Sequence, residues 1–146
     1  RVSRGSWQGV GKMADLATAF RDRLIANGAV NAVVSTRIYW GVVPQDAALP
    51  YVRLHIISDP RPEHLKGYQG SRRTRIQASC FASSFGAAKQ LGTKIVQAVN
   101  APWSATGGRV GRVKCEGPRE GQGTDTPNGF IHHQIVEAMM EHTFQD

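Results

Sequence analysis

The sequence predicts an α+β fold: a mostly antiparallel β-sheet with two amphipathic helices packed on one face, in the order α-β-β-β-α-β-β. Two segments repeat apolar residues with the period of a helix, and several others alternate apolar with polar residues, as half-buried strands do. Two helices are too few to cover both faces of such a sheet. The second face is therefore expected to be half exposed or used by a partner.

The first helix is expected at residues 14–27, "ADLATAFRDRLIAN". Leu16, Phe20 and Leu24 recur at every fourth position and form one apolar stripe along this segment. The Asn-Gly pair at residues 27–28 then predicts a left-handed helix stop.

Three strands are expected next. After a short helical turn, the first covers residues 37–40. The segments "YVRLHIIS" (51–58) and "RTRIQASCFA" (73–82) both alternate apolar with polar residues and are expected to pair antiparallel. The connection between them has about a dozen residues, and loops of that length in compact domains are usually functional or mobile.

The second helix is expected at residues 85–101, after a serine pair at 83–84 that can cap it. Residues 102–108, "PWSATGG", are expected to break the chain before a strand at 109–117. Residues 118–129 are expected to form a second long loop, and residues 130–142 a final long strand.

The core is expected to form from the apolar stripes of both helices and the inward positions of the strands. Its predicted members are Leu16, Phe20, Leu24, Leu91, Ile95, Val99, Val52, Leu54, Ile56, Ile76 and Ala78.

Composition indicates an ordinary globular chain, because 40% of its residues are hydrophobic and 20% are charged. No apolar run approaches the roughly 20 residues that cross a bilayer, so a soluble protein made in a cytoplasm is expected. The net charge of +7 is compatible with nucleic acid, an acidic partner or simple solubility. Residues 1–12 are expected to be a disordered tag, a linker or a misassigned gene start, with a basic arm as the alternative, and residues 13–146 a single domain.

No catalytic, cofactor-binding or metal-binding residues are predicted. Cys80 and Cys115 lack the spacing of a zinc site or a disulfide framework and are interpreted as core residues. His132 and His133 are adjacent in a strand and point to opposite faces, so they cannot chelate one metal together. A pair of acids in the last strand, Glu137 and Glu141, could share a face, but a solvated strand face explains them better than catalysis.

The long connection before the strand at 73–82 is the candidate functional segment, because it concentrates arginine and lysine beside planar side chains. Such clusters suit phosphate contacts and stacking, although a charged loop also keeps a sheet edge soluble. The loop is expected to be flexible in the free protein, with Arg72 and Arg73 at its edge. The residues assigned to an inter-subunit or channel-facing surface are Arg61, His64, Lys66, Tyr68, Arg72 and Arg73.

Two stretches then carry a family resemblance: "TRIYWGVVPQDAALPYVRLHIISDPRPEHLKG" (36–67) and "RIQASCFASSFGAAKQLGTKIVQAV" (75–99). With the leading amphipathic helix, they resemble the tail completion, or tail terminator, proteins of long-tailed phages. The chain is most similar to the version carried by phage-like gene transfer agents. The resemblance runs from Met13 to His142 and leaves residues 1–12 outside it.

The resemblance implies a structural protein and not an enzyme. Such proteins form a six-membered ring that caps the finished tail tube, stops its growth and joins it to the head connector. The implied partners are copies of the same chain, the tail tube protein and the head-tail connector or stopper protein, with transient, non-specific contact to passing DNA and no membrane. The implied location is the head-proximal end of the tail of a virion or phage-like particle, after synthesis in the bacterial cytoplasm.

Two other functions remain compatible with the residues alone. The basic loop and the net charge suit a small nucleic-acid-binding module, which would bind tightly as a monomer with a steep salt dependence. The five histidines suit a metal-dependent hydrolase only weakly, because they lack ligand spacing.

Overall fold

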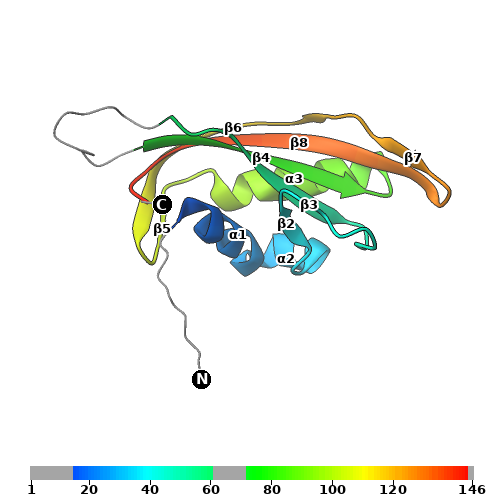
Figure 1. Ribbon diagram of the computed structural model, residues 1–146, viewed down its shortest axis with the longest axis horizontal. Helices are drawn as coiled ribbons and strands as arrows, with labels where there is room; N and C mark the ends of the chain where they lie inside the picture. The colour runs from blue at the N-terminus through cyan, green and yellow to red at the C-terminus, as the bar shows by residue number, and fades with distance from the viewer. Residues whose placement is uncertain (1–14, 61–71, 145–146) are drawn as a thin grey trace, which may run out of the picture.

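The computed structural model describes residues 15–60 and 72–144, which form three helices and one seven-stranded sheet (Figure 1). The elements are α1 (Leu16–Ala26), α2 (Gly28–Val34), β2 (Ile38–Trp40), β3 (Tyr51–Ser58), β4 (Arg72–Ala82), α3 (Phe85–Val99), β5 (Trp103–Ala105), β6 (Gly108–Glu120), β7 (Thr124–Thr126) and β8 (Gly129–His142). The predicted α+β class is confirmed, with the expected helical turn forming a third helix.

Short polar side chains begin all three helices. Asp15 accepts a hydrogen bond from the Thr18 amide at 2.8 Å, and Ser84 accepts one from the Ala87 amide at 3.1 Å. Asn27 ends α1 and also caps α2 through the Val30 amide at 3.0 Å. The predicted left-handed stop at residues 27–28 is therefore wrong, because Asn27 has extended backbone angles and starts the next helix at once.

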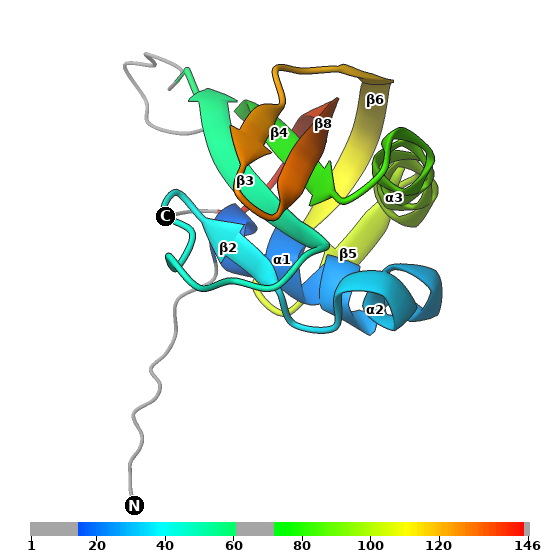
Figure 2. The same ribbon diagram turned by 90° about the vertical axis from the view of Figure 1, so that its right-hand side faces the viewer.

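The sheet has the strand order β2-β3-β4-β8-β6-β5, with β7 paired to β8 (Figure 2). Only β2 and β3 run parallel, and β3 pairs antiparallel with β4 as the alternation predicted. The central pair is long: β4 and β8 stay in register from Arg72 opposite His142 to Ala82 opposite His132. The curled sheet bends around the three helices, which all lie on one side of it (Figures 1 and 2).

The core lies between the helices and the covered face of the sheet. Ten of the eleven predicted core residues are buried, and β8 adds Val136, Ala138 and Met140. Ile56 is the exception, with 45% of its surface exposed. The alternation along β3 predicted burial correctly as far as Leu54. Because β2 pairs only with residues 52–54, Ile56 lies beyond the covered part of β3, at an open edge.

Two predicted loops contain strands instead. Residues 102–108 include β5, which pairs with β6 and buries Trp103 between Phe144 and the Arg23 guanidinium. Residues 118–129 hold the end of β6, β7 and the start of β8. Glycine in this segment allows close approach, since a Cβ on Gly121 would lie 2.6 Å from the His133 ring.

Candidate assembly surface

The face of the sheet opposite the helices is covered by no described element and is the candidate functional surface (Figure 1). It is built by alternation, because odd-numbered residues of β4 and β8 point to it, while the even-numbered residues of β4 and those of β8 from Gln134 onward are buried. Its central rows carry charged side chains, and one end carries aromatic rings. We call this surface the open face.

Glu137 on β8 is the centre of the charged part. Its two carboxylate oxygens accept hydrogen bonds from Arg75 of β4 at 2.8 Å and from Arg119 of β6 at 2.9 Å. These two hydrogen bonds hold the pKa of Glu137 below its usual value. Glu116 of β6 lies directly opposite Glu137 in the sheet register, and the two arginines offset this juxtaposition of like charges.

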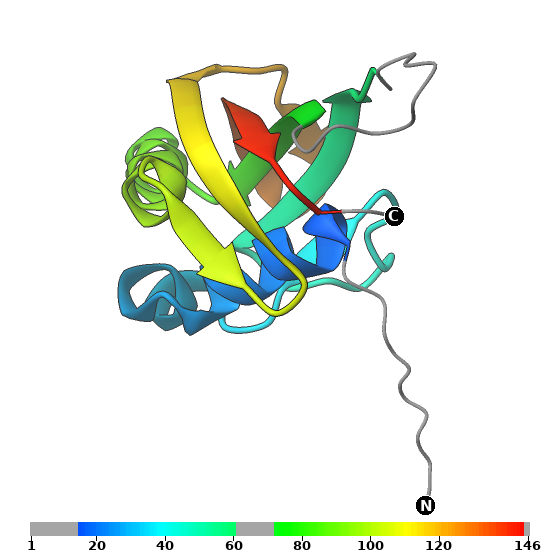
Figure 3. The same cartoon turned by 90° about the vertical axis from the view of Figure 1, so that its left-hand side faces the viewer.

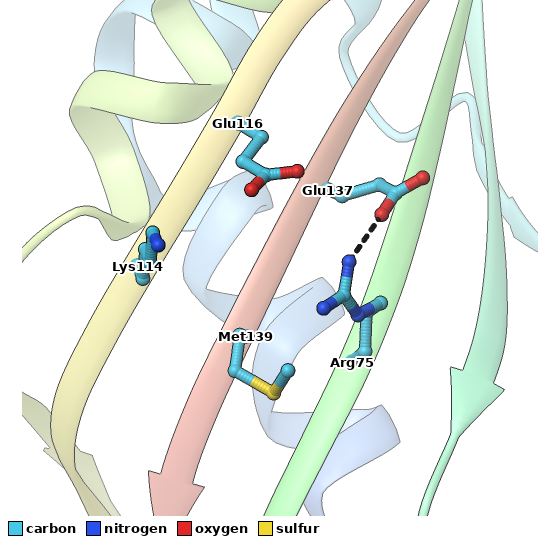
Figure 4. A pocket seen from close by; sticks show the side chains of 5 residues that line it. All are labelled: Arg75, Lys114, Glu116, Glu137 and Met139. Carbon is cyan, nitrogen blue, oxygen red and sulfur yellow. Dashed lines mark hydrogen bonds and ion pairs between the residues drawn. The ribbon is translucent and has the colours of Figure 1, made fainter.

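A small pocket of about 110 Å³ lies beside this ion pair (Figure 4). Glu137 reaches toward β4 and meets Arg75, while Glu116 and Lys114 project from β6 on the other side of β8. Met139 completes the lining. Ligand sites usually enclose about 300 to 1,000 Å³, so the pocket has room for water and not for a substrate.

A second ion pair on the open face is much looser. Arg73 lies 3.3 Å from Glu141, with side chains 62% and 34% exposed. Such pairs contribute only about 0 to 1 kcal/mol to stability. Two further cations on this face, Arg112 and Lys114 of β6, have no ion-pair partner within the described ranges.

The aromatic end of the open face is a row of four rings across neighbouring strands. Tyr39, Tyr51, Phe81 and His133 follow one another with ring centroids 6.2, 5.0 and 4.4 Å apart. The His133 Nδ1 donates to the carbonyl oxygen of Gln122 at 3.0 Å, and its buried Nε2 has no partner among the described residues. Burial lowers the pKa of His133, so the ring is neutral at neutral pH.

The structure places the predicted loop residues in two different environments. Arg61, His64, Lys66 and Tyr68 lie outside the described residues, and the expected flexibility and contacts of that loop stay a prediction. Arg73 lies on the open face.

Arg72, by contrast, points to the covered side and is only 4% exposed, so its expected place at an exposed loop edge is wrong. Its guanidinium pairs with Asp59 at 2.5 Å. Thr74 donates to the same carboxylate at 2.8 Å and lies 2.8 Å from the Nε2 of His142. These four side chains, which we call the buried polar cluster, link the end of β3 to β4 and β8.

Sequence reasoning found part of the charged network. The shared face of Glu137 and Glu141 is confirmed by their positions on β8. Their arginine partners were missed, although the alternation in β4 already placed Arg73 and Arg75 on its polar side. The alternation within one strand does not give the register between β4 and β8, and it is this register that places the arginines beside the glutamates.

Other chemical sites are not evident in the described parts of the chain. No group of three or more metal-ligating side chains occurs there, and no described helix is long and apolar enough to cross a membrane. Burial raises the pKa of the Cys80 thiol to about 12 and that of the Cys115 thiol to about 11. Neither thiol is therefore an activated nucleophile.

Comparison with known proteins identifies the family. A search of curated proteins finds no match. Among solved structures, a chain from the virion of a native gene transfer agent particle is 21% identical, with a TM-score of 0.57 over 86% of this chain and 94% of that one. A second solved protein, known by a sequence identifier, is 17% identical, with a TM-score of 0.56 over 89% of this chain and 95% of that one. At these identities both likenesses show a shared fold.

The family assignment rests on sequence. Residues 18–138 match the model of the family described as Tail completion protein gp17. The match runs from α1 into β8, so it includes residues of all three helices and of every strand of the sheet. The chain therefore belongs to the Tail completion protein gp17 family, a family of structural tail proteins that are not enzymes.

Proposed function

We propose that this protein is a tail terminator, whose copies form a closed ring that caps the finished tail tube, stops its growth and joins the tube to the head connector. The observation that carries the proposal is the family match across residues 18–138. The shared fold with a chain of a gene transfer agent virion supports the same assignment and favours a phage-like particle as the source.

The open face supports an assembly role. Its ion pairs are partly exposed to solvent and its small pocket suits only water, which gives this surface the properties of a contact area and not of a reaction site. A closed cyclic ring uses two surfaces of each subunit without uncontrolled growth, as a structure that must stop a tube requires. We take a hexamer as the size of this ring.

The ring would lie at the head-proximal end of the tail, between the tube protein and the head connector, after synthesis in the bacterial cytoplasm. DNA would pass through it on delivery. Contacts with DNA in transit should be independent of sequence and sensitive to salt, because they would involve phosphates and not bases.

Deletion of the gene tests this function. Particles made without the protein should have tails of abnormal length that fail to join heads, and the wild-type gene supplied in trans should restore joining. Electron microscopy measures both the length distribution and the fraction of joined particles. Tails of normal length that join heads without the protein would refute the proposal.

A further inference from the structure

Two strands of the sheet have edges that no described element covers. On one side, β2 pairs only with residues 52–54, which leaves the β3 edge, residues 55–58, with β4 as its sole described neighbour. On the other side, β5 pairs only with residues 108–110, which leaves the β6 edge, residues 111–116, with β8 alone. The two edges lie on opposite sides of the sheet, with β6 in yellow and β3 in blue-green in Figure 3.

Both edges carry apolar side chains that are less buried than those of the central strands. Ile56 and Ile57 on the β3 edge are 45% and 49% exposed, whereas Ile76, opposite Ile56 on β4, is 1% exposed. On the β6 edge, Val113 and Cys115 point to the covered face but are only half buried. The β3 edge therefore carries apolar surface without a cover in the single chain, and the apolar side chains of the β6 edge are only partly covered.

The strand directions make these two edges compatible with each other. From one edge to the other the order is β3-β4-β8-β6, and every neighbouring pair is antiparallel. An even number of alternating strands gives β3 and β6 opposite directions. If rotation about an axis along the strands relates the copies, the β3 edge of one meets the β6 edge of the next antiparallel, the more stable kind of pairing.

Charge opposes the competing self-pairing of β6. Two β6 edges placed side by side would bring Arg112 and Lys114 of both copies together, and like charges across a strand pair are destabilising. The β3 edge carries no arginine or lysine. The stretch of β6 that can pair ends at Glu116, because a bulge and Pro118, which has no amide hydrogen, follow it.

We infer that the β3 edge of one copy pairs with the β6 edge of the next, so that the sheet continues from subunit to subunit around the ring. Side chains of the covered faces then meet across the joint, and Ile56 packs beside Val113 or Cys115 of the neighbouring copy. This inference rests on the proposed ring and specifies which surfaces of the chain close it.

Cysteine cross-linking in purified, joined particles tests the joint. Ile56→Cys is combined with native Cys115, or with Val113→Cys in a Cys115→Ala background, because pairing in register brings position 56 opposite one of these two. Particles are oxidised mildly, and the chains are separated on a non-reducing gel. One combination should give a ladder of cross-linked chains up to the closed ring, since each subunit then bonds to two neighbours.

The matched control is Ile56→Cys with Cys115→Ala, which should stay monomeric on the gel. Dimers from this control would show that two β3 edges pair with each other and would overturn the inference. Absence of a ladder in both combinations would also overturn it, while the proposed function would stand if the protein is present in joined particles. Joined particles that lack the protein would instead refute the proposed function itself.

A second variant measures the effect on assembly. Ile56→Lys places an inward-pointing charge on the edge, a device by which natural proteins prevent strand addition. Because Ile56 is half exposed, the free chain should keep its melting temperature, but joined particles should be lost. Val42→Lys, at a site that is 84% exposed and outside both edges, is the control and should assemble normally. An Ile56→Lys variant that joins as well as the wild type would contradict the inference.

Discussion

Arg72 and Arg73 are neighbours in sequence with the same charge, yet they occupy opposite faces of β4 and different physical environments. Arg72 belongs to the buried polar cluster, where it is held 2.5 Å from Asp59. Arg73 lies on the open face, 3.3 Å from Glu141 and largely solvated. The difference shows that the face of the strand, and not the residue type, decides whether a charge holds this fold together or remains available to a partner.

The largest difference between the faces should appear on β3. Leu54 is fully buried, and Leu54→Ala should lower the free energy of unfolding by about 2 to 5 kcal/mol. Arg53→Ala should cost about 1 kcal/mol, because it removes the 2.6 Å hydrogen bond from Arg53 to the Gly41 carbonyl. Chemical denaturation of both variants measures the contrast. Equal losses would mean that the two faces of β3 have been assigned incorrectly.

Arg72 and Arg73 allow a matched test of the two faces, because substituting either residue by alanine removes one positive charge. Arg72→Ala should cost about 3 kcal/mol, the lower end for breaking a buried pair, since Asp59 keeps its hydrogen bond from Thr74. Arg73→Ala should cost no more than about 1 kcal/mol. Thermal melting at neutral pH distinguishes them. If Arg72→Ala lowered the melting temperature only slightly, the pairing of Arg72 with Asp59 would contribute little to stability.

A substitution at Glu137 measures how much the ion pairs of the open face contribute to the free energy of unfolding. Glu137→Gln should cost about 1 kcal/mol at neutral pH, since Arg75 and Arg119 are partly exposed and regain water. The folded pKa of Glu137 is lowered, so its stabilising effect is present above the unfolded value of about 4.3 and is lost as the pH falls through the folded pKa.

Denaturation of Glu137→Gln between pH 7 and pH 3 measures this dependence. The variant should lose less stability than the wild type as the pH falls below about 4.3. Parallel curves for the two proteins would show that the arginine contacts do not act on this carboxylate.

The smallest effect is expected at His133, in the aromatic row. Burial lowers its folded pKa, so the fold favours the neutral ring, and stability should fall as the pH drops below the unfolded value of about 6.5. His133→Phe should remove this dependence while retaining the stack on Phe81. Melting curves between pH 7.5 and pH 5 provide the measurement, and an unchanged slope would exclude His133 as its source.

The sequence was sufficient wherever a pattern depends on neighbours in the chain. The alternation in β4 predicted both faces of the strand over residues 74–80, and the spacing of Leu16, Phe20 and Leu24 predicted the buried stripe of α1. These assignments succeed because the periods of strand and helix are geometric properties of the backbone itself. They were enough to predict an open face with Glu137 on it.

The same local patterns failed where a second segment decides the outcome. Ile56 continues the apolar alternation of β3, but it is exposed because β2 ends too early to cover it. Residues 118–129 were expected to form a loop, but their glycines accommodate the rings of His133 and Phe130 in a paired hairpin. The period of a sequence pattern reveals neither the length of a neighbouring strand nor the position of an aromatic ring that packs against a glycine.

Patterns within the sequence therefore predicted the α+β class, the order of the main elements, the two apolar stripes and the family of this protein. The folded structure was needed to show which charges pair, that Arg72 is buried while Arg73 is exposed, and which strand edges are left uncovered. The physical reason is that periodicity sets the direction of a side chain, whereas burial and pairing depend on strand register and on segments distant in the chain.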